Sequence, residues 1–326
     1  NLTHRGATGY DSKLGDGAGI LIQMPDTLIR DEAKKLSVDL PLSGQYACGL
    51  IFFPQSNSHR TQCEKIITDI IKEEGQTFLA WRDVPTNNSN IADAAKALEP
   101  KIKQVIIGQG GDIKDQNHFE RKLFVIRKRI EHSVKKLGLD DPAQFYIPSL
   151  SSRTIVYKGM LLANEVDTYY LDLKDERVTS ALALVHQRFS TNTFPAWDLA
   201  HPFRMIAHNG EINTVQGNVN WMRARHESMQ SVLLGDDLEK LWPLIVEGQS
   251  DSACFDNCLE LLVAGGYSLP HAMMMLIPEA WSGNPMMDEI MRKRANLGNK
   301  SAEPRSTTPP KTATPPQPST QTKAFE

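Results

Sequence analysis

Residues 186–223 read HQRFSTNTFPAWDLAHPFRMIAHNGEINTVQGNVNWMR, and they are the most informative part of the sequence. It combines an arginine directly after an apolar run, a set of small polar residues, an Asn-Gly pair and several aromatic residues. Ordinary core strands and helices do not need this mixture. It is typical of a pocket that binds a small zwitterion and stabilises a developing oxyanion.

Arg188 follows the predicted strand 183–187, where its planar guanidinium can bind a carboxylate through two hydrogen bonds. The residues after it are small, polar and turn-prone until Pro195 interrupts the chain. We therefore predict that Phe189, Ser190 and Thr191 belong to a lid that covers the pocket.

Two further motifs have two interpretations each. Asn209 and Gly210 follow a second predicted strand, 203–207, and form either a tight hairpin turn or an oxyanion hole. Asp251 opens an apolar helix between two serines, where it serves either to cap the helix or to bind a substrate ammonium. The residues alone leave the first question open, and for Asp251 they favour capping.

Alternating apolar runs and amphipathic stretches predict an α+β layered sandwich with hairpins and parallel crossovers. The clearest helix spans residues 117–137, and its basic face (Arg121, Lys122, Arg127–Arg129, Lys135 and Lys136) is expected to be solvated. Further helices are expected at 26–36, from Ser58 to Gly75, and at 214–229, 237–246, 251–264 and 269–276. Strands are expected at 18–23, 46–53, 78–84, 105–108, 145–150, 153–158, 168–173 and 181–189.

The composition excludes several classes of function. The chain has 326 residues and a net charge of −3, so its charge does not favour nucleic acid or an anionic membrane as a partner. No apolar run reaches transmembrane length. The four cysteines are too few for a disulfide scaffold and lack metal-ligand spacing, and the glycine-rich loop at 15–19 lacks the ending of a phosphate-binding loop. We expect a reducing compartment, the cytoplasm or a plastid, and no metal.

The segments HQRFSTNTFPAWDLAHPF, AHNGEINT and SDSACFDN resemble the type 2 glutamine amidotransferase domain of the glutamate synthase large subunit. The opening NLTHRGATGYDSKLGDGAGILIQMP and the later LPHAMMMLIPEAW are similar to that family as well. The resemblance covers residues 1–287, which we expect to form the amidotransferase domain. Residues 288–326 are rich in proline, serine and threonine and are expected to be a disordered tail.

The resemblance implies an N-terminal-nucleophile hydrolase fold, a four-layer αββα sandwich with two stacked mixed sheets. In that family an N-terminal cysteine attacks the side-chain amide of glutamine, and the ammonia passes to a synthase domain that makes glutamate from 2-oxoglutarate. It implies that Arg188 holds the α-carboxylate of glutamine, that Asp251 holds its α-ammonium, and that Asn209 and Gly210 form the oxyanion hole. FMN and an iron–sulfur cluster are implied for the full-length enzyme, and no cofactor for this chain.

The chain departs from the family pattern at both ends. Asn1 stands at the first position, and the family's nucleophilic cysteine and its strand are absent. We therefore expect a fragment that is truncated at the N-terminus and inactive alone, whose partners are glutamine and the synthase domain of the same polypeptide. The alternative is a non-catalytic interaction module that retains the amidotransferase fold and docks through its proline-rich tail.

Overall fold

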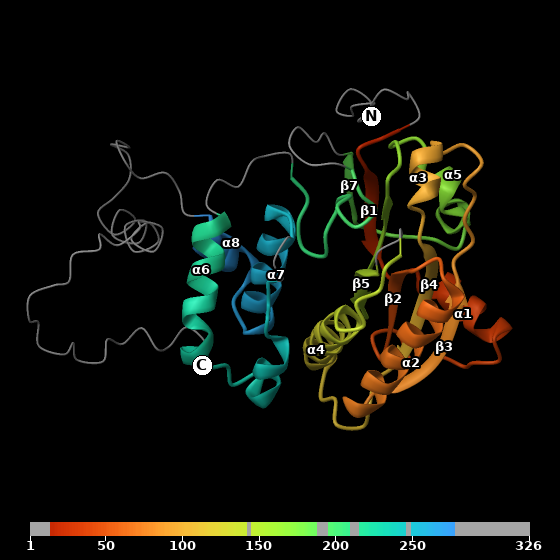
Figure 1. Ribbon diagram of the computed structural model, residues 1–326. Coiled ribbons are helices and arrows are strands. Elements are labelled where there is room, and N and C mark those ends of the chain that lie inside the picture. Colours follow the sequence, from red (N-terminus) through yellow and green to blue (C-terminus); the bar gives the residue numbers. More distant parts are fainter. Residues whose placement is uncertain (1–13, 142–144, 188–194, 209–214, 246–248, 278–326) are drawn as a thin grey trace, which may run out of the picture. The chain divides into compact units, whose positions relative to one another are not determined.

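The computed structural model describes residues 14–141, 145–187, 195–208, 215–245 and 249–277. The chain divides into two compact units, residues 1–210 and residues 211–326. The first unit contains all the strands of the described part of the chain, and the second contains helices and turns (Figure 1).

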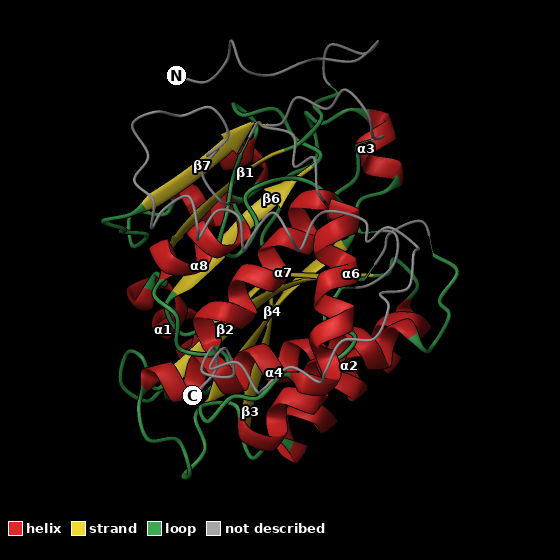
Figure 2. Ribbon diagram, turned by 90° about the vertical axis from the view of Figure 1, so that its left-hand side faces the viewer, coloured by secondary structure: helices red, strands yellow, loops and turns green. Residues whose placement is uncertain are grey.

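One sheet of the first unit has three strands in the order β6-β1-β7. Strand β1 (Ala18–Gln23) lies in the middle and pairs antiparallel with β6 (Thr154–Gly159) and with β7 (Ala183–Gln187), as Figure 2 shows. Strand β7 ends at Gln187, so the predicted strand 183–187 before Arg188 is confirmed. This sheet therefore positions the segment in which the site is predicted.

The other sheet has four strands in the order β3-β4-β2-β5, and all its pairs are antiparallel. Its strands are β2 (Tyr46–Phe53), β3 (Thr77–Asp83), β4 (Lys101–Gly108) and β5 (Tyr146–Ser151). Strand β2 is an unbroken apolar run that is buried along its whole length, as expected for a strand covered on both faces. No parallel pair occurs among the described strands, so the expectation of parallel crossovers and mixed sheets is wrong for this part of the chain.

Two apolar cores lie on the two faces of the four-stranded sheet. One contains Cys48, Leu50 and Phe52 of β2 together with residues of the three-stranded sheet such as Ile22 and Tyr157. The other contains the opposite face of β2 and the apolar faces of helices α2 (Asn57–Glu73) and α4 (Gln116–Lys135). Helices, sheet and sheet therefore form successive layers, which confirms the α+β class. The fourth layer of the sandwich stays a prediction.

Helices α2 and α4 begin where side chains cap their first free N–H groups. Ser56 accepts a hydrogen bond from the backbone N–H of His59 at 3.4 Å, and Asp115 accepts one from His118 at 2.8 Å. The cap of α2 is thus Ser56, two residues before the predicted Ser58.

Helix α4 departs from its predicted solvent exposure. Arg127 and Lys128, assigned to a solvated basic face, are 1% and 0% exposed. Both bind Glu131 one turn later, at 2.5 Å from the Arg127 Nη1 atom and 2.9 Å from the Lys128 Nζ atom. The expectation of a fully solvated face is wrong, because ion pairing within the helix allows these charges to be buried.

The short helices of the first unit include one segment that was predicted as a strand. The short helices are α1 (Asp26–Lys35), α3 (Asp93–Ala97), α5 (Val166–Tyr169) and the 3₁₀ turn η2 (Leu171–Lys174). The last two replace the predicted strand 168–173. Tyr169 and Tyr170 pack edge to face at 4.8 Å and are almost completely buried, so tertiary packing overrides the strand propensity of this run.

The second unit contains α6 (Val215–Arg225), α7 (Asp251–Ala264), α8 (Leu269–Leu276) and the 3₁₀ turns η3 (His226–Ser228) and η4 (Gly235–Leu241). The predictions for α7 and α8 are confirmed, whereas the helix expected at 237–246 is the shorter η4. Among the helices that the structure describes, none has the length and apolar character needed to cross a membrane.

Candidate functional site

Most of the predicted site residues lie outside the described part of the chain. They are Arg188, Phe189, Ser190, Thr191, Asn209 and Gly210. Their roles stay predictions, and the site is built here from the described residues that flank them.

Asp251 is the first residue of α7, and Ser250 is its cap. The Ser250 hydroxyl accepts a hydrogen bond from the backbone N–H of Ala253 at 3.2 Å. The Asp251 carboxylate accepts one from the backbone N–H of Ser252 at 2.6 Å. Helix capping therefore accounts for Ser250, while binding of an ammonium by the half-buried Asp251 stays a prediction.

The two segments that contain Arg188 and Asn209 are joined through their described neighbours. His186, on β7, contacts the backbone oxygen of His208 through its Nε2 atom at 3.1 Å. Arg188 lies two residues after His186, and Asn209 is covalently bonded to His208. The structure thus brings together the residues that precede the predicted carboxylate ligand and the predicted oxyanion hole.

A third histidine, His201, packs against His186. The rings of His186 and His201 stack at 4.5 Å with an interplanar angle of 29°, and His201 also packs against Phe203 at 4.7 Å. The sequence does not predict this cluster, because the three histidines show no metal-ligand spacing. The only local signal is that His186 and His208 each lie within two residues of a predicted site residue.

The predicted strand 203–207 is absent. Residues 203–206 form a turn, in which the N–H of Phe203 donates to the carbonyl of Ile206 at 2.9 Å. The hairpin interpretation of Asn209 and Gly210 needs a strand before them. That interpretation is weakened, while the oxyanion-hole interpretation needs no such strand.

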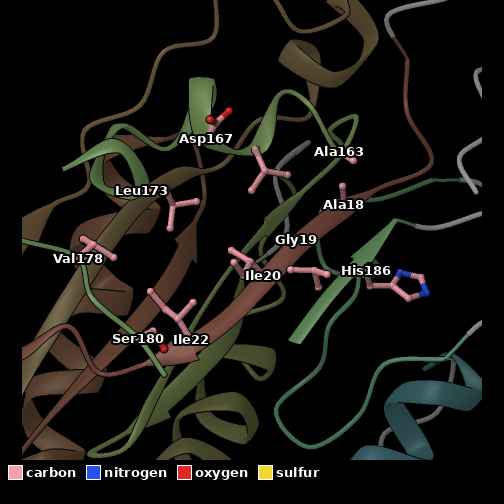
Figure 3. Close-up of a pocket in the computed structure, with 12 residues that line it drawn as sticks. Ala18, Gly19, Ile20, Ile22, Ala163, Asp167, Leu173, Val178, Ser180 and His186 are labelled. Carbon is pink, nitrogen blue, oxygen red and sulfur yellow. The ribbon is translucent and has the colours of Figure 1, made fainter. Parts of the chain in front are cut away.

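A pocket of about 410 Å³ lies over the β1 and β7 face of the three-stranded sheet (Figure 3). Ala18, Ile20 and Ile22 line it from β1, and apolar residues such as Leu173 and Val178 line it opposite them. Asp167, Ser180 and His186 also line it, but no lysine or arginine is among its described lining residues, so it offers no fixed cation for the carboxylate of a zwitterion. We therefore do not assign this pocket to glutamine.

All four cysteines are buried, and none of them forms a disulfide. Burial raises the pKa of the Cys48 thiol to about 12 and the pKa values of Cys63 and Cys254 to about 11. A thiol with such a pKa is almost entirely protonated at neutral pH and is a poor nucleophile. None of these three cysteines has the properties of an activated catalytic thiol.

The described residues do not suit an iron–sulfur cluster. Such a cluster needs several cysteine ligands at one place, and no group of three or more His, Cys, Asp or Glu residues with metal-binding geometry occurs in the ranges that the structure describes. We derive no step through a cluster or through FMN.

Comparison with protein families gives a match to the glutamine amidotransferases of class II over residues 1–304. The chain belongs to this family. The match extends past residue 287, where the end of the domain was predicted, and the position of that boundary stays a prediction.

Similar proteins are glutamate synthases. The chain is 47% identical over 303 residues to glutamate synthase [NADPH] large chain of Bacillus subtilis, a match that covers 93% of the chain and 20% of that protein. It is 46% identical over 290 residues to glutamate synthase [NADH] of Schizosaccharomyces pombe, covering 87% of the chain and 14% of the relative. It is 38% identical over 286 residues to the chloroplastic ferredoxin-dependent glutamate synthase of Oryza sativa, covering 88% and 18%.

These matches confirm the resemblance to the amidotransferase domain of glutamate synthase. The chain spans only 14% to 20% of the length of these relatives. Activities that depend on the rest of such a polypeptide are therefore proposals for this chain.

Proposed function

We propose that this chain is the glutaminase module of a glutamate synthase, and that it binds glutamine for release of ammonia toward 2-oxoglutarate in a synthase portion. The observation that carries the proposal is the contact between His186 and the His208 carbonyl, together with the family match. That contact supports a common site for the segments that begin after these two residues.

Glutamine carries one positive and one negative charge on its α-carbon, and we propose a fixed partner for each. Arg188 binds the α-carboxylate, Asp251 binds the α-ammonium, and Asn209 and Gly210 stabilise the oxyanion that forms at the side-chain amide. Phe189, Ser190 and Thr191 cover the bound substrate.

The chain by itself is proposed to bind glutamine without hydrolysing it. All four cysteines are described and buried, so none is exposed to attack a substrate amide. Thiols that form no disulfide are also what a reducing compartment favours. FMN and an iron–sulfur cluster are assigned to the synthase portion rather than to this chain.

Calorimetric titration with glutamine tests the proposal. A charge-assisted contact contributes about 1.5–3 kcal/mol, so Arg188→Ala and Asp251→Asn are each expected to weaken binding by roughly ten- to a hundredfold. Matched controls at exposed positions, Arg153→Ala and Asp112→Asn, should leave the affinity unchanged. If the unchanged chain gives no more heat than Arg188→Ala, the proposal is wrong.

A further inference from the structure

Three histidines of the first unit form a cluster that the proposed function does not yet use. His186 lies on β7, while His201 and His208 lie on the chain that returns toward residue 209. His186 and His201 are 8% and 6% exposed, and the rings of His201 and His208 are 5.4 Å apart. Two of the three rings are therefore buried, and His208 is half-buried.

The contact between His186 and the His208 carbonyl fixes the protonation of His186. A carbonyl oxygen can only accept a hydrogen bond, so the Nε2 atom of His186 must carry a proton and donate it. The stacked ring of His201 covers the His186 ring, and Phe203 packs edge-on against His201. These contacts hold the donor in one direction.

The same hydrogen bond joins two segments that are 22 residues apart in the chain. The first continues into Arg188, which is proposed to bind the α-carboxylate. The second continues into Asn209 and Gly210, which are proposed to bind the side-chain amide oxygen. The distance between these two groups must match the length of glutamine, and small errors in such a distance cost much of the binding or the rate.

We propose that His186 is a positioning residue. It sets the distance between Arg188, which binds the α-carboxylate, and the residues that bind the side-chain amide oxygen, and so determines specificity for a side-chain amide. This inference rests on the proposed function. In this role His186 acts through the backbone of His208, which its Nε2 atom binds, and not through a contact with substrate.

Two ligands separate this role from a merely structural one. L-Glutamine and L-norvaline have the same charged groups on the α-carbon, and norvaline lacks the amide. In the unchanged chain, glutamine should bind more tightly than norvaline. His186→Phe keeps a ring to stack on His201 and removes the donor, so glutamine affinity should fall about three- to tenfold while norvaline affinity stays the same.

A conservative variant provides the rescue. His186→Gln can place an amide N–H near the lost Nε2–H, and it should restore most of the preference for glutamine. His118→Phe, a half-buried histidine on α4 outside the cluster, is the matched control and should keep the full preference. The ratio of the two dissociation constants is the quantity to compare, because loss of folded protein lowers both affinities alike.

The outcomes are distinct. If the unchanged chain binds neither ligand, the proposed function is wrong and the inference about His186 is wrong with it. If it prefers glutamine and His186→Phe keeps that preference, the inference alone is overturned. Should His186→Phe not fold, ¹⁵N NMR of the imidazoles in the unchanged chain decides, because a His186 protonated only on Nδ1 excludes the hydrogen bond.

Discussion

Among single residues, the guanidinium of Arg82 is a buried charge held by several partners. It donates to both carboxylate oxygens of Asp172 at 2.7 Å and to Gln104 at 2.8 Å, and the Tyr157 hydroxyl donates to Asp172 at 3.1 Å. Burial alone would lower the pKa of Arg82, but hydrogen bonding to Asp172 outweighs it and raises this pKa. Arg82 is therefore charged in the folded protein and depends on its partner.

Asp172→Asn should destabilise the fold by about 3–5 kcal/mol, because it removes the carboxylate that Arg82 binds at 2.7 Å and leaves only that of Glu32, 3.6 Å from the Arg82 Nε atom. Urea unfolding followed by circular dichroism measures the change. Glu73 also pairs with an arginine, Arg129, but the Glu73 side chain is 57% exposed. Glu73→Gln should therefore lower the free energy of unfolding by less than about 1 kcal/mol. Equal losses in the two variants would contradict this account.

Sequence reasoning reached some of the site residues and missed others for a physical reason. The strand before Arg188 was predictable, because the local pattern of its own five residues is enough to indicate a strand. The cluster of His186, His201 and His208 was not, because those side chains meet only after the chain has turned back on itself. The periodicity and spacing of residues in the sequence do not predict a contact between a histidine ring and a distant backbone carbonyl.

At the scale of elements, α4 shows how much a helical pattern determines. Its extent was predicted within two residues at each end, since apolar residues recur at helical spacing and Asp115 caps it. The burial of Arg127 and Lys128 was not predictable, because the pattern identifies an apolar face and cannot show which polar side chains become buried. The strand predicted at 168–173 was wrong for a similar reason, since tertiary packing decided it.

The carboxylate of Glu131 on α4 gives a pH-dependent prediction. Burial alone would raise its pKa, but the charges of Arg127 and Lys128 outweigh it and hold the pKa below its ordinary value of 4.5. A depressed pKa contributes stability that is complete above the unfolded-state value and decreases as the pH falls through the folded-state value. Glu131→Gln should therefore cost about 3 kcal/mol at pH 7, and the cost should shrink below about pH 4.5.

The measurement is the difference in unfolding free energy between the unchanged chain and Glu131→Gln at several pH values from 7 to 3. Asp69→Asn is a suitable control, because Asp69 makes an exposed ion pair with Lys65 on α2. Such an exposed pair contributes little to stability, because solvent screens it. A difference for Glu131→Gln that stays constant over this pH range would show that its ion pairs are not what stabilises the fold.

At the scale of the whole molecule, the prediction of family and class succeeded, while the arrangement of the sheets did not follow from the pattern. A buried antiparallel strand such as β2 has the same continuous apolar run that is typical of parallel sheets, so the sequence could not distinguish the two. The resemblance did identify the family, because the segments around residues 186–223 are specific to it.

The composition of the last residues gives a prediction about the whole chain. Residues 305–326 have little apolar surface to offset the entropy cost of ordering, and they contain Pro309, Pro310, Pro315, Pro316 and Pro318. A chain that ends at Pro304, where the family match also ends, should therefore melt within about 2 °C of the full chain. Calorimetry measures the melting temperature, and titration of both chains with glutamine should give equal affinities. A lower melting temperature would mean that the tail packs on the domain, and a weaker affinity would mean that it contributes to the site.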